Sequence, residues 1–155
     1  MTIIIISVIA ATAVALVFIS LKEQKKAAPS NASLSAEQVV SGVIKKMNYQ
    51  NLSPVSDENI SKFYDIPDGT VTDYSVYISN NSGNETELAC FKLKNTESEQ
   101  KVLNCVYDYT KSKSSIEQSP ATSTQSMVSS HYPYVFAVIS SDCENAVKTF
   151  EKLIN

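Results

Sequence analysis

The chain has 155 residues, of which 43% are hydrophobic, and its net charge at pH 7 is −3. It contains no Arg, no Trp and only three Gly. An acidic chain of this kind is a poor nucleic-acid binder, because phosphate contacts need a basic face. The scarcity of Gly excludes a glycine-rich phosphate-binding loop. The length after the first 26 residues suits one small domain.

The N-terminal segment is the most informative part of the sequence. Residues 3–21 contain no charged residue, no Pro and no Gly. As a helix they would be about 28 Å long, close to the roughly 30 Å hydrocarbon core of a bilayer. We therefore expect residues 1–26 to be a transmembrane anchor or uncleaved signal, with residues 3–21 in the membrane. Residues 27–34 are mostly small and polar, and are expected to form a tether.

Two alternatives to the anchor stay open, a cleaved secretory signal and a buried helix. A signal has a shorter apolar run of about 7–15 residues after a basic start, and no Lys precedes this run. The orientation is also open. Lys22, Lys25 and Lys26 follow the apolar run, which by the positive-inside rule favours a cytoplasmic domain.

Residues 35–93 predict helices followed by a hairpin. Ser35 and Gln38 match a capping box, and a helical apolar stripe follows as far as Met47. Residues 51–55 interrupt the helix, and residues 57–64 form a short helix or turn. Residues 71–79 alternate as a strand, residues 80–84 are turn formers, and residues 86–93 form the return strand.

Residues 96–155 predict a second helix–hairpin–helix segment. Thr96 and Glu99 match a capping box for a helix running to about residue 116, and a Ser/Thr-rich loop extends to residue 125. A short strand at 127–130 and a turn at 131–133 precede the strand 134–140, whose two apolar faces indicate a central position. Ser141 and Glu144 match a third capping box, before a final amphipathic helix.

The element order predicts an α+β domain over residues 35–155. Its sheet is expected to be mostly antiparallel, with two hairpins and three to four helices in two layers.

Several segments together resemble a known family. They are Phe63–Ile66, Tyr74–Ser79, Glu87–Lys92 and Tyr134–Ser140, followed by a closing amphipathic helix. In this order they are similar to the bacterial domain of unknown function numbered 4358, over about residues 36–155. The resemblance implies an anchored or lipoprotein-like protein on the outer face of the cell, and it implies no catalytic residues. The chain lacks the lipid-attachment Cys that members often carry, and has Pro133 where members tend to have Gly.

Cysteine and histidine offer one candidate for chemistry. Cys143 would lie in the first turn of the last helix, where the helix dipole lowers a thiol pKa, and His131 would be its base. Asp142 and Glu144 flank the thiol and oppose a thiolate. Cys90 and Cys105 are expected to be core residues, or a disulfide in an exported domain. The three Cys and the one His lack the pattern of a zinc site, and no cofactor is expected.

We therefore expect a membrane-anchored, extracytoplasmic, non-enzymatic binding or accessory module. Its partners are the membrane, through residues 3–21, and a protein or small molecule, but no nucleic acid. The candidate contact surface is the hairpin tip and the Ser/Thr-rich loop, with the residues Tyr77, Asn81, His131 and Tyr132. Two alternatives remain, a thiol-dependent or hydrolytic enzyme around Cys143 and His131, and a cytoplasm-facing regulatory domain.

Overall fold

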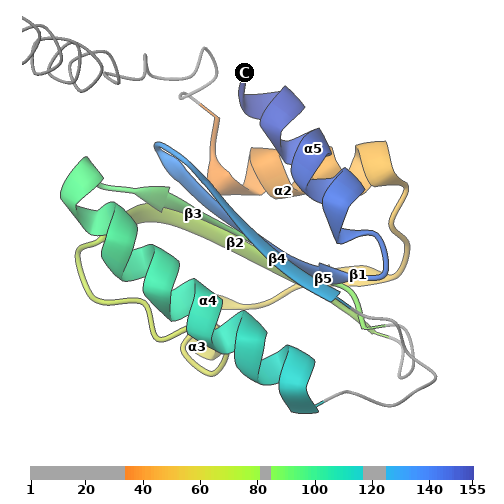
Figure 1. Ribbon diagram of the computed structural model, residues 1–155, viewed down its shortest axis with the longest axis horizontal. Helices are drawn as coiled ribbons and strands as arrows, with labels where there is room; N and C mark the ends of the chain where they lie inside the picture. The colour runs from red at the N-terminus through yellow and green to blue at the C-terminus, as the bar shows by residue number, and fades with distance from the viewer. Residues whose placement is uncertain (1–33, 81–84, 117–124) are drawn as a thin grey trace, which may run out of the picture.

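The computed structural model describes residues 34–80, 85–116 and 125–155, and these form a sheet with helices on both sides (Figure 1). In chain order they are α2 (Ala36–Met47), β1 (Leu52–Pro54), α3 (Asp57–Ile60), β2 (Val71–Ser79), β3 (Glu87–Leu93), the 3-10 turn η1 (Thr96–Ser98), α4 (Glu99–Ile116), β4 (Gln125–His131), β5 (Tyr134–Ser140) and α5 (Cys143–Ile154). The expected transmembrane helix at residues 3–21 and the expected tether up to residue 33 lie outside the described residues. Within the described ranges, no helix is long and apolar enough to cross a membrane.

The five strands form one sheet in the order β1-β2-β3-β5-β4, and every neighbouring pair is antiparallel. The two expected hairpins are present as β2–β3 and β4–β5. Strand β5 lies between β3 and β4 and is buried along its whole length, which confirms its expected interior position. Strands β1 and β4 form the two edges of the sheet.

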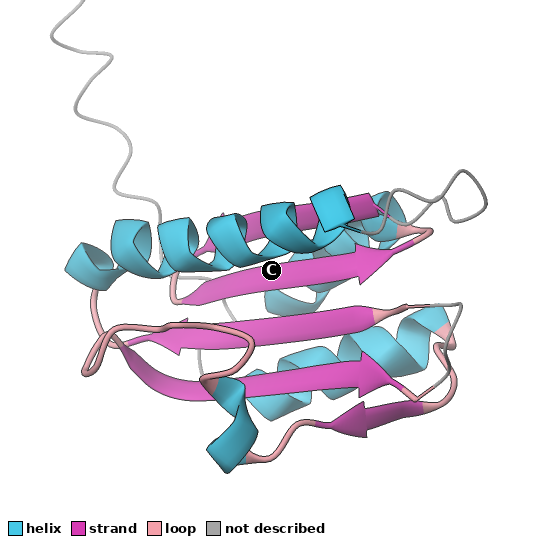
Figure 2. Cartoon of the chain, turned by 90° about the horizontal axis from the view of Figure 1, so that it is seen from below, coloured by secondary structure: helices cyan, strands magenta, loops and turns pink. Residues whose placement is uncertain are grey.

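The domain has three layers, so the expectation of two layers was wrong. Helices α2 and α5 cover one face of the sheet, and α3 and α4 cover the other (Figures 1 and 2). The reason is the composition of β3 and β5. Both strands are apolar on both faces, and each apolar face of a sheet has to be covered to leave water.

The α2/α5 face holds one of two hydrophobic cores. The predicted stripe of α2 contributes Val39, Val40 and Val43, all fully buried. The rings of Phe136 on β5 and Phe150 on α5 stack with centroids 4.7 Å apart and planes 10° apart. This stack joins α5 to the middle of the sheet.

The α3/α4 face holds the second core. Alternate residues of the central strands point into it, including Ala89, Phe91 and Val135. Val102 and Val106 of α4 and Tyr64, which follows α3, pack onto them. Helix α4 lies along the β4/β5 side of this face, whereas α3 lies near β1 and β2 (Figure 2).

One capping prediction was confirmed and two were wrong. The Ser35–Gln38 capping box is formed in both directions. Before α4, however, the side chain of Asn95 accepts from the backbone N–H of Ser98, and the chain enters the helix through η1. Before α5 the N-cap is Asp142, which makes no capping hydrogen bond with its side chain. Several polar residues compete for each of these two starts, and packing decides between them.

The strand boundaries also differ from expectation. β4 extends over seven residues rather than the four expected. Residues 52–54, expected only to interrupt the helix, pair with β2 as the edge strand β1. A three-residue strand is too short to show a period of two, so its pairing was not visible in the sequence.

Candidate functional site

The most unusual polar group in the described part of the domain is the carboxylate of Glu87. Glu87 is the first residue of β3, and only 7% of its surface is exposed. It follows the alternation of Ala89 and Phe91, so its side chain points into the α3/α4 face. A carboxylate is rarely buried unless it has partners, because burial removes its hydration.

Two tyrosine hydroxyls bind this carboxylate. Tyr64 donates a hydrogen bond of 2.6 Å to Oε1, and Tyr109 on α4 donates one of 3.0 Å to Oε2. The two tyrosine rings lie 4.4 Å apart, and Phe63 and Phe91 pack edge-on against Tyr109 and Tyr64 respectively. We call Tyr64, Glu87 and Tyr109 the carboxylate cluster. It joins three elements that are distant in sequence.

Burial raises the pKa of the Glu87 carboxyl above its ordinary value. The hydrogen bonds from Tyr64 and Tyr109 and the charge of Lys113 act in the opposite direction. The pKa of Tyr64 is raised well above its ordinary value, first by burial and then by the adjacent carboxylate. Tyr64 is therefore a hydrogen-bond donor at physiological pH and not a phenolate.

The arrangement suits proton binding and mechanical linkage better than nucleophilic chemistry. Both carboxylate oxygens accept hydrogen bonds from tyrosine hydroxyls. A general base needs a free lone pair directed at a substrate, whereas here the aromatic rings surround the carboxylate. In residues 34–80, 85–116 and 125–155, no group of three or more His, Cys, Asp or Glu is placed to hold a metal ion.

The expected surface residues do not converge on one point. The hydroxyl of Tyr77 on β2 donates to Glu37 of α2 at 2.6 Å, on the α2/α5 face. His131 ends β4, and Tyr132 packs against the α3/α4 core at the following turn. Asn81 lies outside the described residues. Tyr77 and Tyr132 thus belong to opposite faces of the sheet.

Cys143 and His131 are not brought together. The thiol of Cys143 lies 3.0 Å from the carbonyl oxygen of Gln125, which is the first residue of β4. His131 is the last residue of the same strand. Six residues of strand separate the two ends by about 20 Å. Burial raises the pKa of Cys143, and the charge of Asp142 raises it further. The helix start therefore does not produce a thiolate.

The other two cysteines are also free thiols, so the alternative of a disulfide between them was wrong. Cys90 is fully buried in the α2/α5 core, whereas Cys105 belongs to α4 on the other side of the sheet. The interpretation of Cys90 as a core residue is confirmed. The sheet itself separates the two sulfur atoms.

Comparison with known proteins identifies the family. The model of a domain of unknown function, DUF4358, matches residues 45–140, which is more than half of the chain. The chain belongs to the DUF4358 family. No curated protein and no solved structure matched it.

The match to DUF4358 is shorter than the expected resemblance over residues 36–155. It begins near the end of α2 and ends with β5. The DUF4358 match therefore contains the whole carboxylate cluster and His131, but leaves out α5 with Cys143.

Sequence reasoning missed Glu87 and Tyr64 as partners. The sequence did contain one signal that Glu87 is buried, because Glu87 lies on the same face of an apolar strand as Ala89 and Phe91. A charged residue at a core-facing position indicates a buried partner. The sequence pattern did not identify the partners, since Tyr64 and Tyr109 come from segments that only the tertiary structure places beside β3.

Proposed function

We propose that this DUF4358 protein is a membrane-anchored domain on the outer face of the cell that acts as a binding or accessory module. The uncharged run of residues 3–21 carries the proposal, since it has the length and composition of a membrane-spanning helix. The outer-face placement is supported by the resemblance to anchored and lipoprotein-like family members. The three Lys after the run favour the opposite orientation.

The first described residues of the domain, Leu34 and Ala36, are hydrogen-bonded to the sheet. The carbonyl oxygen of Leu34 accepts hydrogen bonds from Lys92 Nζ at 2.9 Å and from the Tyr134 hydroxyl at 2.8 Å. Two residues later, the backbone N–H of Ala36 donates to Asp73 at 2.6 Å. The first residues of the domain are thus attached to three strands, so a pull on the tether is borne by the sheet.

The two loops of the expected contact surface join the domain at the end of the sheet opposite Leu34, whereas His131 and Tyr132 of the same surface lie at the Leu34 end. Leu34 is held where β3 ends and β5 begins. The strand registers place Ser79 and Glu87, which flank the first expected loop, near Ile139 at the end of β5. Gln125, which follows the second loop, pairs with Ser140. Both loops therefore start and end far from the tether, which suits a surface presented away from the membrane.

Protease treatment of intact cells tests the orientation. Trypsin cleaves after Lys, and cleavage after Lys26 would release a fragment that begins at Ala27. We expect this fragment in the medium, and expect no release from a variant in which Lys22, Lys25 and Lys26 are all Gln. Release only after the cells are opened would assign the domain to the cytoplasmic side and overturn the outer-face placement.

Membrane attachment is tested separately. The full chain should sediment with membranes and dissolve only with detergent, whereas deletion of residues 3–21 should leave the domain in the supernatant. Full-length protein in the detergent-free supernatant would overturn the anchor.

A further inference from the structure

The two edges of the sheet differ in how well they are protected against pairing. Edge strand β1 has three residues and ends at Pro54. Edge strand β4 has seven residues, and its sequence QSMVSSH contains no Lys, Arg, Asp, Glu or Pro. Natural proteins protect exposed edges with short strands, charges or Pro, because an open edge pairs with other strands. Of these three features, the residues of β1 show two and the residues of β4 show none.

We propose that two copies of this chain pair through the outer edges of their β4 strands. A symmetric antiparallel pair centred on Val128 places Val128 opposite Val128, Met127 opposite Ser129, and Gln125 opposite His131 of the second copy. No like charges face each other in this register, so no charge repulsion between the two strands opposes the pairing. The result is one continuous sheet of ten strands.

Helix α4 supplies a second observation at the same edge. Glu99, Leu103 and Tyr107 lie four residues apart and so form one row along α4. The carboxylate of Glu99 accepts a hydrogen bond from the hydroxyl of Ser130, which places this row on the β4 side of the helix. Tyr107 is the one large hydrophobic residue in the described ranges that is mostly exposed, with 55% of its surface accessible.

The opposite side of α4 faces the carboxylate cluster. Tyr109 lies two residues, or about 200°, around the helix from Tyr107 and contacts Tyr64. The row ending at Tyr107 therefore points away from α3 and toward the β4 edge. In the paired form, the α4 helices of the two copies lie next to each other and cover Leu103 and Tyr107.

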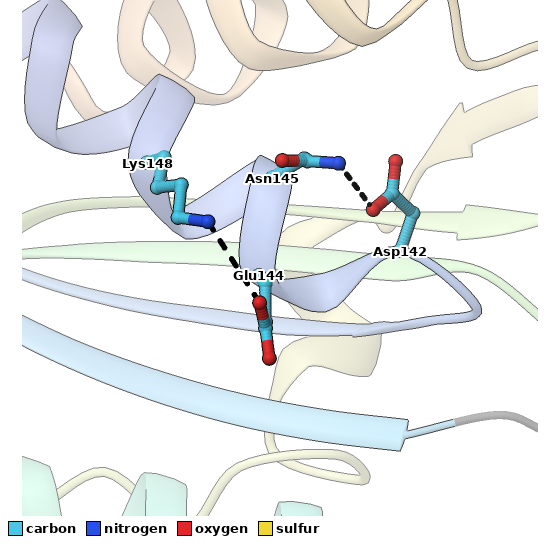
Figure 3. A network of polar contacts seen from close by, with 4 residues as sticks. All are labelled: Asp142, Glu144, Asn145 and Lys148. Carbon is cyan, nitrogen blue, oxygen red and sulfur yellow. Dashed lines mark hydrogen bonds and ion pairs between the residues drawn. The ribbon is translucent and has the colours of Figure 1, made fainter.

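Helix α5 flanks the same edge on the other face of the sheet. Thr149 contacts Met47, and Leu153 lies against Gly42, so this side of α5 faces α2. The side away from α2 carries Glu144, Lys148 and Glu151. Glu144 and Lys148 form an exposed ion pair at 3.7 Å, on the side of α5 along which β4 runs in Figure 3.

The symmetry of this pair is compatible with two anchored chains. The two-fold axis is perpendicular to the sheet, so it leaves α2 of both copies on the same face. Leu34 of each copy then lies on this same face of the ten-stranded sheet, and the two Leu34 residues are at opposite ends of the strands. The pairing itself does not depend on the anchor.

The molecular mass of the full chain in mild detergent tests the proposal. At roughly 10 µM we expect the mass of two chains after subtraction of the detergent. Ser129→Lys introduces the protecting charge that β4 lacks, and should weaken the dimer at least tenfold. The matched control is Ser53→Lys, which places the same charge at a half-buried Ser on the other edge strand and should leave the dimer intact. A monomeric wild-type chain would overturn the proposal.

A second variant keeps the test decisive if Ser129→Lys does not fold. Tyr107→Glu changes an exposed helix position and gains a favourable spacing to Lys111, so the monomer should fold. It should also weaken the dimer at least tenfold, whereas Asn104→Glu on the outward side of α4 should not. A dimer that persists in both folded variants, Ser129→Lys and Tyr107→Glu, would assign association to another surface, such as residues 3–21.

Discussion

The hydroxyl of Tyr64 lies 2.6 Å from the carboxylate of Glu87, 23 residues further along the chain, and both side chains are buried. This hydrogen bond attaches the segment after α3 to the start of β3. The second hydrogen bond, from Tyr109, attaches α4 to the same carboxylate. The cluster therefore fixes how the α3/α4 layer sits on the sheet.

Replacement of Glu87 should separate the loss of hydrogen bonds from the loss of charge. Glu87→Ala leaves the hydroxyl of Tyr64 buried without its acceptor, which costs about 1–3 kcal/mol of unfolding free energy. Glu87→Gln keeps the shape and can accept from one tyrosine while donating to the other. We expect the Gln variant to be at least as stable as the wild type near neutral pH. Urea unfolding followed by circular dichroism measures both, and equal losses in the two variants would contradict the interpretation.

The pH dependence of stability follows from the raised pKa of Glu87. The folded state binds this proton more tightly than the unfolded state, whose value is near 4.5. The stabilising contribution is therefore fully present below the unfolded pKa and is lost as the pH rises through the folded pKa. We expect the unfolding free energy of the wild type, minus that of Glu87→Gln, to fall from about pH 4 upward and then level off. A difference that rises with pH would show that the folded state favours the ionised carboxylate.

The three thiols should react with iodoacetamide in a fixed order. Cys105 is partly exposed, whereas Cys90 and Cys143 are buried, and loss of hydration raises the pKa of all three thiols. We expect Cys105 to be alkylated first in the native protein and the other two only as the domain opens, as measured by peptide mass spectrometry. His131→Ala should leave the rate at Cys143 unchanged, because the two residues lie at opposite ends of β4. Fast alkylation of native Cys143 that depends on His131 would revive the thiol-enzyme alternative.

The aromatic stack between Phe136 and Phe150 should be the main attachment of α5. Phe150 is fully buried, so Phe150→Ala should lower the unfolding free energy by about 3–5 kcal/mol. Asn145→Ala, at an exposed position on the same helix, removes a surface hydrogen bond to Asp142 (Figure 3) and should cost less than about 1 kcal/mol. Similar losses in the two variants would show that α5 adds little to the core.

The capping box at Ser35 should stabilise the first turn of α2. Ser35→Ala removes the acceptor for the backbone N–H of Gln38 and should cost about 1 kcal/mol. Ser41→Ala, at an exposed position within α2, is the matched control and should be nearly neutral or slightly stabilising, since Ala is the better helix former. Hydrogen exchange at the first turn of α2 should rise only in the first variant.

The sequence by itself determined most of the elements, because their signals are local. The period of two in β2, the helical spacing in α2 and α5, and the reciprocal side chains of Ser35 and Gln38 each act within a few residues. Only the tertiary structure decided the number of layers, the pairing of β1 and the neighbours of Glu87. These depend on which apolar faces meet and on contacts such as Tyr64–Glu87, which join residues far apart in the chain, and no local pattern specifies such contacts.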